Sequence, residues 1–182
     1  GTIVSNQIEG DSVEQPVISG VATDLSEAKI TVVGVPDVPG KAAQIFTIVA
    51  QAHANVDMIV QNVSTAVSGL TDISFTLPKA QAGATLAALE ENKGAVGFLS
   101  LQHDDQIAKV SVVGAGMRTN AGVSAKFFTA LFEAGINIEM ITTSEIRISV
   151  VTRADVAADA TRAIHTAFGL DADDEAVVYG GT

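Results

Sequence analysis

The chain has 182 residues, a length that suits one large domain or two small ones. Its formal net charge of −11 and its aromatic fraction of 4% argue against nucleic-acid binding, because phosphates need a basic surface and unstacked bases need aromatic platforms. The sequence contains no cysteine, which excludes disulfides, thiol catalysis and cysteine metal sites and fits a cytoplasmic location, and no apolar run approaches the roughly eighteen residues of a membrane span.

The chain begins with a polar, mixed segment, and we interpret residues 1–15 as a linker or leader. This segment has neither a basic region nor a long apolar core, so it does not resemble a secretory signal. The absence of an initiator Met indicates a processed start or a piece of a longer chain. Residues 16–23 are next, and their pattern is typical of a short strand.

The next stretch predicts a strand, a turn and a helix. Residues 29–34 alternate β-branched side chains, as a buried strand does, and the two prolines and the Asp of residues 35–39 indicate a turn. Pro39 stands where a first-turn proline belongs. From residue 40 onward a helical period places on the inward face Ala42, Ile45, Phe46 and Val49.

The first module continues with a second strand at 55–63, a hairpin turn at Ser68-Gly69 and a third strand at 70–77 that Pro78 ends. A second helix is expected at 81–92, with Leu86 and Leu89 inward. A fourth strand at 96–101 and a polar joint at 103–105 complete the module.

About eighty residues after the first strand the same pattern returns, at residues 109–145. Lys29 matches Lys109, Gly34 matches Gly114 and Gly40 matches Gly122, with a longer turn in the second copy. An internal repeat of this length indicates one fold used twice. The second copy predicts strands at 109–114, 136–141, 146–151 and 175–179, an N-cap at Asn120, a capping box from Thr152 to Asp155 and a helix stop at Gly169. Its inward helix positions are Phe127, Phe128, Leu131 and Phe132, then Val156, Ala160, Ile164 and Phe168.

Each module therefore has the order β-α-β-β-α-β, which predicts an α+β fold of two ferredoxin-like modules in tandem. Each antiparallel sheet should carry its two helices on one face, leaving the other face or the sheet edges for a partner. The boundaries expected are 1–15 for the leader, 16–103 for module one and 104–182 for module two. The strand at 16–23 can instead complete module two, which would make module one an insertion.

The turn before the first helix is the most informative place for a site. Its helix N-terminus offers unpaired backbone N–H groups and a partial positive charge, which suit a free α-carboxylate, and Gly40 lets a ligand approach the backbone. Asp37 can accept an α-ammonium group, while Gln61 and Asn62 on the neighbouring strand offer amides. The alternative is that Asp37 and Gly40 are ordinary turn residues. Because the second copy has no acid matching Asp37, we expect a site that uses the first turn and part of module two.

The other motifs in the sequence do not indicate a cofactor, metal or catalytic site. Gly114-Ala115-Gly116 is followed by Thr119 where a dinucleotide loop needs a third glycine. The remaining candidates are interpreted as surface or helix-end histidines (His53, His103, His165), as polar contacts without a nearby histidine (Ser64, Thr143, Ser144), and as a solvated acidic joint (Asp171, Asp173, Asp174, Glu175).

The sequence resembles the tandem ACT-domain regulatory region of aspartokinases, specifically the β subunit of the actinobacterial kind that lysine and threonine inhibit together. The matching stretches, in order, are residues 20–32 (GVATDLSEAKITV), 36–43 (PDVPGKAA), 55–64 (NVDMIVQNVS), 70–78 (LTDISFTLP), 104–117 (DDQIAKVSVVGAGM) and 136–150 (INIEMITTSEIRISV). The last residues, DDEAVVYGGT, also match the end of the family.

This resemblance implies a regulatory chain without catalytic residues, metal or cofactor of its own. In the family, ATP, magnesium and aspartate bind a preceding catalytic lobe, and ACT modules form a homodimer and sense amino acids, with threonine between modules of two chains and lysine near the catalytic lobe. The implied effector contacts fall on Asp37, Val38, Pro39, Gly40, Lys41 and Ala42 in the first turn, on Asn55, Val56, Asp57 and Gln61 on the strand, and on Val123, Ser124, Asn137, Ile138, Ser144 and Glu145 in module two. Positions at which family members lose feedback sensitivity fall on Ala42, Gln61, Ser64, Thr71, Ser74, Thr143 and Ser144.

The sequence departs from the family at a few positions. Asn120-Ala121 replaces a usual His-Pro, Ser124 replaces a usual Thr but keeps the hydroxyl, and Leu77 replaces a frequent Cys. The loop change leaves the effector preference open. Three other functions are weighed against feedback regulation: an amino-acid sensor of another biosynthetic enzyme, a module that only dimerises, and an acylphosphatase-like enzyme, for which the first turn lacks the required Arg.

Overall fold

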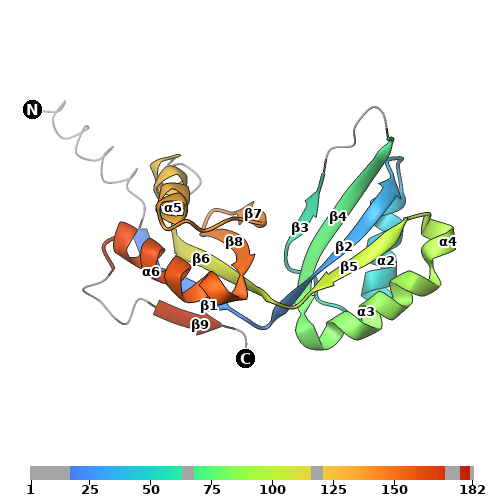
Figure 1. The fold of residues 1–182 in the computed structure, drawn as a ribbon, viewed down its shortest axis with the longest axis horizontal. Coiled ribbons are helices and arrows are strands. Elements are labelled where there is room, and N and C mark those ends of the chain that lie inside the picture. The colour runs from blue at the N-terminus through green and yellow to red at the C-terminus, as the bar shows by residue number, and fades with distance from the viewer. Residues whose placement is uncertain (1–16, 63–67, 116–120, 171–176, 181–182) are drawn as a thin grey trace, which may run out of the picture. The chain divides into compact units, whose positions relative to one another are not determined.

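The computed structural model describes residues 17–62, 68–115, 121–170 and 177–180, and its contacts divide the chain into two compact units (Figure 1). We call Ser26–Ile107 the inserted unit. The split unit combines the described residues up to 25 with those from 108 on. Each unit has its own sheet, its own helices and its own hydrophobic core.

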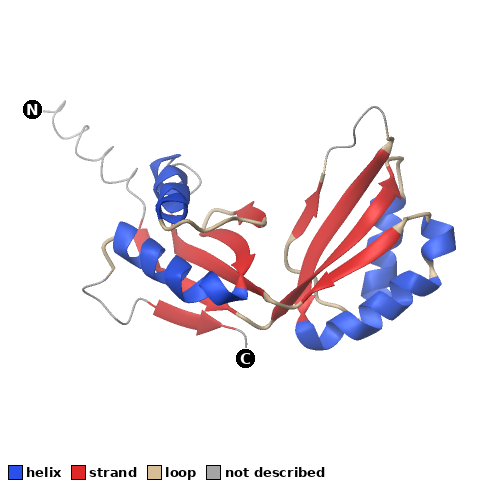
Figure 2. Ribbon diagram, in the orientation of Figure 1, coloured by secondary structure: helices blue, strands red, loops and turns tan. Residues whose placement is uncertain are grey.

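The inserted unit has the predicted ferredoxin-like topology. Its elements are β2 (Glu27–Pro36), α2 (Lys41–Gln51), β3 (Ile59–Gln61), β4 (Leu70–Pro78), α3 (Lys79–Glu91), α4 (Lys93–Val96) and β5 (Ser100–Asp104). The strands lie in the order β3-β4-β2-β5, and every neighbouring pair is antiparallel. Figure 2 shows α2 and α3 on the same side of this sheet. The sheet face under the helices is where this unit buries its apolar side chains.

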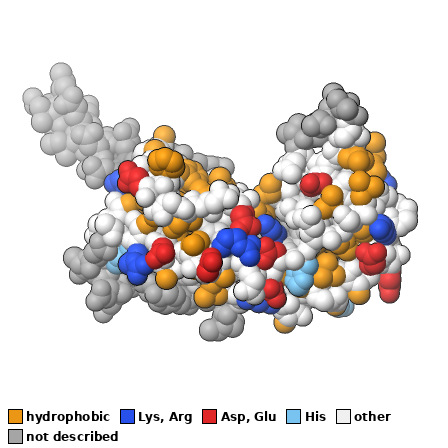
Figure 3. Space-filling model, in the orientation of Figure 1, with side chains coloured by type: hydrophobic (Ala, Val, Ile, Leu, Met, Phe, Trp, Pro, Cys, Tyr) orange, Lys and Arg blue, Asp and Glu red, His pale blue; other side chains and the backbone are white. Residues whose placement is uncertain are grey.

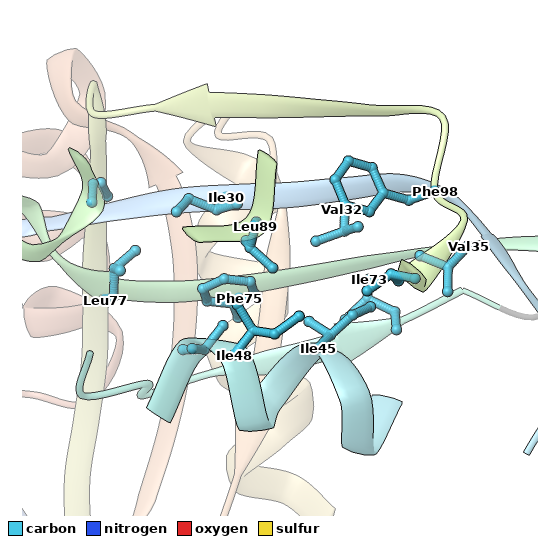
Figure 4. Packing of buried hydrophobic residues seen from close by; sticks show 14 residues of the cluster. Ile30, Val32, Val35, Ile45, Ile48, Ile73, Phe75, Leu77, Leu89 and Phe98 are labelled. Atoms are coloured by element: carbon cyan, nitrogen blue, oxygen red, sulfur yellow. The ribbon is translucent and has the colours of Figure 1, made fainter. Parts of the chain in front are cut away.

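The core of the inserted unit is built from alternating strand positions and one helix face (Figure 4). Ile30 and Val32 on β2 and Phe75 on β4 are fully buried, as the period of two predicts. From α2 the buried residues are Ile45, Ile48 and Val49. Ala42, which the helical period placed inward, is exposed, because it lies in the first turn of α2, beyond the part of the helix that covers the sheet.

The split unit repeats this topology with one extra strand. Its elements are β1 (Val17–Asp24), β6 (Ile107–Ala115), α5 (Ala121–Glu133), β7 (Met140–Thr143), β8 (Arg147–Arg153), the 3-10 turn η1 (Ala154–Val156), α6 (Ala157–Ala167) and β9 (Val177–Gly180). The sheet order is β7-β8-β6-β1-β9. β1 pairs antiparallel with β6, and β9 adds to β1 in parallel. The first strand of the chain therefore takes the fourth-strand position of this sheet, which is the insertion arrangement that the sequence left open.

Several expected boundaries and faces are wrong in detail. Phe132 is 80% exposed, because it follows the buried Leu131 by one residue and so points about 100° round the helix. No side chain caps η1 or α6, and the Thr152 hydroxyl instead donates to the Arg153 carbonyl at 3.2 Å, so the capping box does not form. Gly169 is left-handed just after α6, as expected of a C′ stop.

The expected strands are also shorter or shifted. Of the expected strand at 55–63, the structure describes residues 55–62, and within these Ile59–Gln61 pairs as a strand. The expected strand at 136–141 begins at Met140. Val96, the expected start of the fourth strand, is instead buried in the short helix α4. The strand β5 includes His103 and Asp104, which were expected to form a polar joint. His165 lies in the last turn of α6 and is only 8% exposed, so it is a helix-end histidine but not a surface one. The leader, Asn120 and the acidic run at 171–175 lie outside the described residues.

Two further observations limit what the described residues can do. None of the helices in the described ranges is long and apolar enough to cross a membrane. On the face seen in Figure 3, basic and acidic side chains of the split unit intermingle, and Arg153 Nη1 lies 3.6 Å from Glu139 Oε2. That mixing leaves no extended basic surface on this face, which is what nucleic acid would require.

The two phenylalanines of α5 provide a matched test of the core. Phe127→Ala should lower the free energy of unfolding by about 3–5 kcal/mol, because Phe127 is fully buried. Phe132→Ala should change it by no more than about 0.5 kcal/mol, because Phe132 is exposed. Urea titrations followed by circular dichroism measure both. Equal losses for the two variants would contradict the packing of α5.

Candidate functional site

A cavity of about 310 Å³ lies in the inserted unit where β2 ends and α2 begins. It brings together the whole predicted first turn and two predicted strand residues. The lining residues are Val35, Pro36, Asp37, Val38, Pro39, Gly40, Lys41, Ala42, Gln61, Thr71 and Ile73. Figure 4 shows that Val35 and Ile73 lie at one end of the core, near Ile45 of α2, and that Leu77 lies at the other. The cavity is thus an opening at one end of the core.

The start of α2 gives this cavity a positive character. Gly40 is the residue that precedes the helix, and α2 has no side-chain cap and no acidic residue in its first turn. The first N–H groups of an uncapped helix have no intrahelical partner and carry the positive end of the helix dipole. They can therefore bind an anionic group such as a carboxylate.

Gly40 is required by its backbone conformation. Its φ of 95° is in the left-handed region, which side chains with a Cβ rarely adopt. A Cβ added to Gly40 would have no atom within 4 Å, so the space beside it is open. Gly40 therefore allows the chain to turn into α2 and leaves room beside the helix N-terminus.

The turn itself is held by main-chain hydrogen bonds. The Asp37 N–H donates to the Gly69 carbonyl at 3.0 Å, and the Val38 N–H donates to the Pro36 carbonyl at 2.9 Å. The side chain of Asp37 is exposed. A carboxylate at the rim of the cavity, with its backbone fixed, can bind a cationic group that enters beside the helix N-terminus.

Two polar side chains complete the lining from the neighbouring strands. Gln61 pairs with Ile73 across β3 and β4, and its side chain is exposed. Thr71 is 4% exposed, and its hydroxyl donates to the Asn62 carbonyl. The amide of Gln61 can donate and accept, while the Thr71 oxygen retains capacity to accept. Asn62, a candidate from the sequence, does not line the cavity.

The other strand residues that the family resemblance implies lie away from this cavity. The Asp57 N–H donates to the Thr76 carbonyl at 3.0 Å, and the Asn55 N–H donates to Gln81 Oε1 at 2.7 Å. Thr76 is five positions beyond Thr71 on β4, which is about 17 Å along a strand. Asn55, its neighbour Val56, and Asp57 therefore belong to the opposite end of the inserted unit.

The feedback-sensitivity positions divide between the two sheet faces. Thr71 lines the cavity, whereas Ser74 lies on the helix-free face, where its hydroxyl is 2.8 Å from the Thr31 hydroxyl. Ser64 lies outside the described residues. Ser74 therefore does not contact the cavity directly.

The module-two candidates all belong to the split unit. Val123 is 4% exposed, so its side chain belongs to the core and any ligand contact would come from its main chain. Ser124 is half-buried at the start of α5, and Asn137 and Ile138 precede β7. Thr143 ends β7, and Ser144 and Glu145 form the exposed turn to β8. A contribution from these residues to the cavity stays a prediction.

The described residues offer little for metal or covalent chemistry. Within them no group of three or more His, Asp or Glu side chains is placed to hold a metal ion. His53 follows α2 with a positive φ of 61°, and His103 lies in β5, so the histidines are in separate elements. What the cavity can do is bind a small molecule with a carboxylate, an ammonium group and a short side chain.

The cavity also has lining residues that the sequence interpretation missed. Val35, Pro36 and Ile73 line it beside the predicted turn. Alternation along β4 is the signal that could have found Ile73, because it shares the inward face with Thr71.

Comparison with known proteins gives a consistent result. Residues 30–92 and 110–168 match the family model of the ACT domain. The chain is 52% identical to an aspartokinase of Mycolicibacterium smegmatis and 47% identical to one of Corynebacterium glutamicum, in both cases over all of this chain and 43% of the relative. The chain thus spans less than half the length of these curated relatives.

Solved structures agree over most of the chain. The regulatory subunit of aspartate kinase from Thermus thermophilus, in its ligand-free form, has a TM-score of 0.79 and 43% identity, covering 84% of this chain and 99% of that one. A crystal structure of aspartokinase alpha and beta subunits contains a chain with a TM-score of 0.78 and 48% identity, with the same coverage of 84% and 99%.

Two glycine variants test the turn before α2. Gly40→Ala should lower the free energy of unfolding by about 1–2 kcal/mol, because alanine is strained at a φ of 95°. Gly83→Ala, in the interior of α3 and with nothing within 4 Å of the added Cβ, should raise it by about 0.5–1 kcal/mol. Urea titrations measure both, and a stabilising Gly40→Ala would contradict the left-handed turn.

Proposed function

Since the chain belongs to the ACT-domain family and corresponds to the regulatory part of aspartokinases, we propose that it binds threonine in the cavity at the start of α2. We further propose that it binds lysine jointly with a catalytic partner, and that the two effectors control the ATP-dependent phosphorylation of aspartate in lysine, threonine and methionine biosynthesis. The chain itself would need no cofactor, and ATP and magnesium would bind the catalytic part. The lack of cysteine is compatible with a cytoplasmic location.

The observation that carries the threonine proposal is the pairing of an uncapped helix N-terminus with a carboxylate at one small cavity. The α-carboxylate would bind the first N–H groups of α2, and the α-ammonium group would pair with Asp37. The amide of Gln61 would bind the side-chain hydroxyl. A free amino acid carries both charges that this arrangement suits.

Simple energetics support the assignment. Micromolar to millimolar binding corresponds to about −8 to −4 kcal/mol. Hydrogen bonds to charged groups contribute about 1.5–3 kcal/mol each, so a few of them are enough to orient the ligand after the cost of ordering it. Because the side chains of Asp37 and Gln61 are exposed, we expect the affinity for threonine to lie nearer the millimolar end of this range.

Control of a kinase requires that the effector bind one arrangement of the protein better than another. A coupling of about 1–3 kcal/mol is typical of such control. We propose that the cavity is completed by the module-two residues Ser124, Asn137 and Ser144 of a second copy in a homodimer, so that threonine stabilises one pairing of modules. This chain is similar to a chain in a crystal structure of aspartokinase alpha and beta subunits. That similarity supports the proposal that it acts beside a separate catalytic subunit.

A thermal-shift screen of the twenty amino acids tests the proposed function. A ligand that binds only the folded chain adds about 2.7 kcal/mol of stability at one hundred times its Kd, so threonine should raise the melting temperature. Lysine alone should have a smaller effect, since its proposed site includes the catalytic partner. If no amino acid shifts the transition, the chain is better described as a module that only dimerises.

The residue roles are tested by calorimetry with threonine. Asp37→Asn removes the charge without changing the shape, and it should weaken threonine binding by about tenfold or more. Gln61→Ala should weaken it as well, through the loss of the amide. The control is Asp105→Asn, since Asp105 is exposed after β5 and does not line the cavity. Unchanged affinity in Asp37→Asn would remove Asp37 from the site.

A further inference from the structure

β2 is irregular just before it reaches the cavity. Val32 pairs with Ile73 and Val35 pairs with Thr71, so two residues of β2, Val33 and Gly34, lie opposite Asp72 alone. An extra residue in one strand of an antiparallel pair is a β-bulge. Bulges often re-aim side chains beside binding sites, and this one lies immediately before the turn that lines the cavity.

The bulge determines the sheet face to which the last side chains of β2 point. Side chains alternate along a strand, and Ile30 and Val32 point into the core. Without the extra residue, Val35 would point to the helix-free face. With it, Val35 is fully buried and lines the cavity. A shift of one residue turns over every side chain that follows, so Asp37 also depends on the bulge for its position.

The carboxylate of Asp72 holds this bulge. The Gly34 N–H, which the bulge removes from the regular ladder, donates to Asp72 Oδ1 at 2.9 Å. Asp72 itself does not line the cavity, because Thr71 and Ile73 occupy the inward positions on either side of it. The contact of Asp72 is therefore with the backbone behind the cavity.

Leu99, the residue that precedes β5, holds the same bulge from the other side. The Leu99 N–H donates to the Val33 carbonyl at 2.8 Å. Gly34 has a φ of 71°, and a Cβ at this position would lie 2.5 Å from Leu99 Cγ. Only glycine fits such a position without a shift of its neighbours. The bulge is thus clamped between Asp72 and Leu99.

The repeat shows that the carboxylate clamp is particular to the inserted unit. Gly114 matches Gly34, but its N–H donates to the main-chain carbonyl of Ile146 at 2.8 Å, and Gly114 is outside the left-handed region. The same fold therefore closes this end of the strand without a carboxylate. The clamp occurs in the unit whose following turn carries Asp37.

We propose that Asp72 is a positioning residue of the amino-acid site: its carboxylate holds the Gly34 bulge and thereby sets the turn from Asp37 to Gly40 in the geometry that binds an amino acid. This proposal rests on the proposed function for its ligand. The position of the turn itself can be tested without ligand.

Threonine calorimetry on the 182-residue chain tests the role in binding. Asp72→Ala should weaken threonine binding by about tenfold, because the Gly34 N–H loses its charged acceptor. Asp72→Asn keeps an Oδ1 acceptor at the same place and should bind within about threefold of the unchanged chain. Asp105→Ala, which removes an acid of the same unit away from the bulge, should bind normally.

Amide hydrogen exchange tests the turn in the absence of threonine. In Asp72→Ala the amides of Gly34, Asp37 and Val38 should exchange at least about tenfold faster, while those of α3 stay unchanged. If Asp72→Ala does not fold, Asp72→Thr replaces it, since threonine favours strands but is too short to keep the contact.

The outcomes separate the two proposals. Normal threonine binding by Asp72→Ala, binding by Asp72→Asn as weak as that of Asp72→Ala, or an equal loss in Asp105→Ala would each overturn the positioning role. If the unchanged chain binds no amino acid, the proposed function fails. The exchange of Gly34 and Asp37 still decides in that case whether Asp72 holds the turn, and unchanged exchange in Asp72→Ala would overturn it.

Discussion

The pairing of β2 with β4 on one side and β5 on the other is the constraint on which the inserted unit depends. A strand bound on both edges cannot slide without breaking two ladders of hydrogen bonds, so its register is strongly determined. Its inward residues Ile30 and Val32 anchor the core under α2 and α3. Because the cavity lies where this strand ends, the position of its backbone is set by a strand that is paired on both edges.

The two units share one fold, and the candidate site described above lies in the inserted unit. Both bury an apolar sheet face under two helices, and both place a hydroxyl pair across the helix-free face, Thr31 with Ser74 and Ser111 with Ser149. They differ at the end of the central strand, where the inserted unit has a left-handed Gly34 and an acidic turn. The shared features maintain the fold, and binding is proposed where the copies differ.

Comparison of prediction and structure shows where local patterns are reliable. The repeat and the β-α-β-β-α-β order are confirmed, because they follow from periods of 2 and 3.6 residues sustained over whole elements. The sheet of the inserted unit is antiparallel as predicted, whereas β9 joins the sheet of the split unit in parallel. Errors occur at strand boundaries and at single helix positions. The helical period placed Ala42 and Phe132 inward, but Ala42, in the first turn of α2, and Phe132, one residue after the buried Leu131 of α5, are both exposed. The implied effector residues stay predictions, although the structure gathers Asp37, Gln61 and Thr71 at one cavity.

The sequence by itself determined the number of modules, through the repeat of residues 29–62 at 109–145. It also determined the order of the elements and the turn that begins the candidate site, because these depend on neighbours a few residues apart. Only the tertiary structure decided that β1 completes the sheet of the split unit, since many strands are compatible with one open sheet edge. It also decided that Asp72 contacts Gly34, across 38 positions of the chain. Contacts between distant segments depend on strand register and on the position of a bulge. Neither can be predicted from the local alternation of apolar and polar residues.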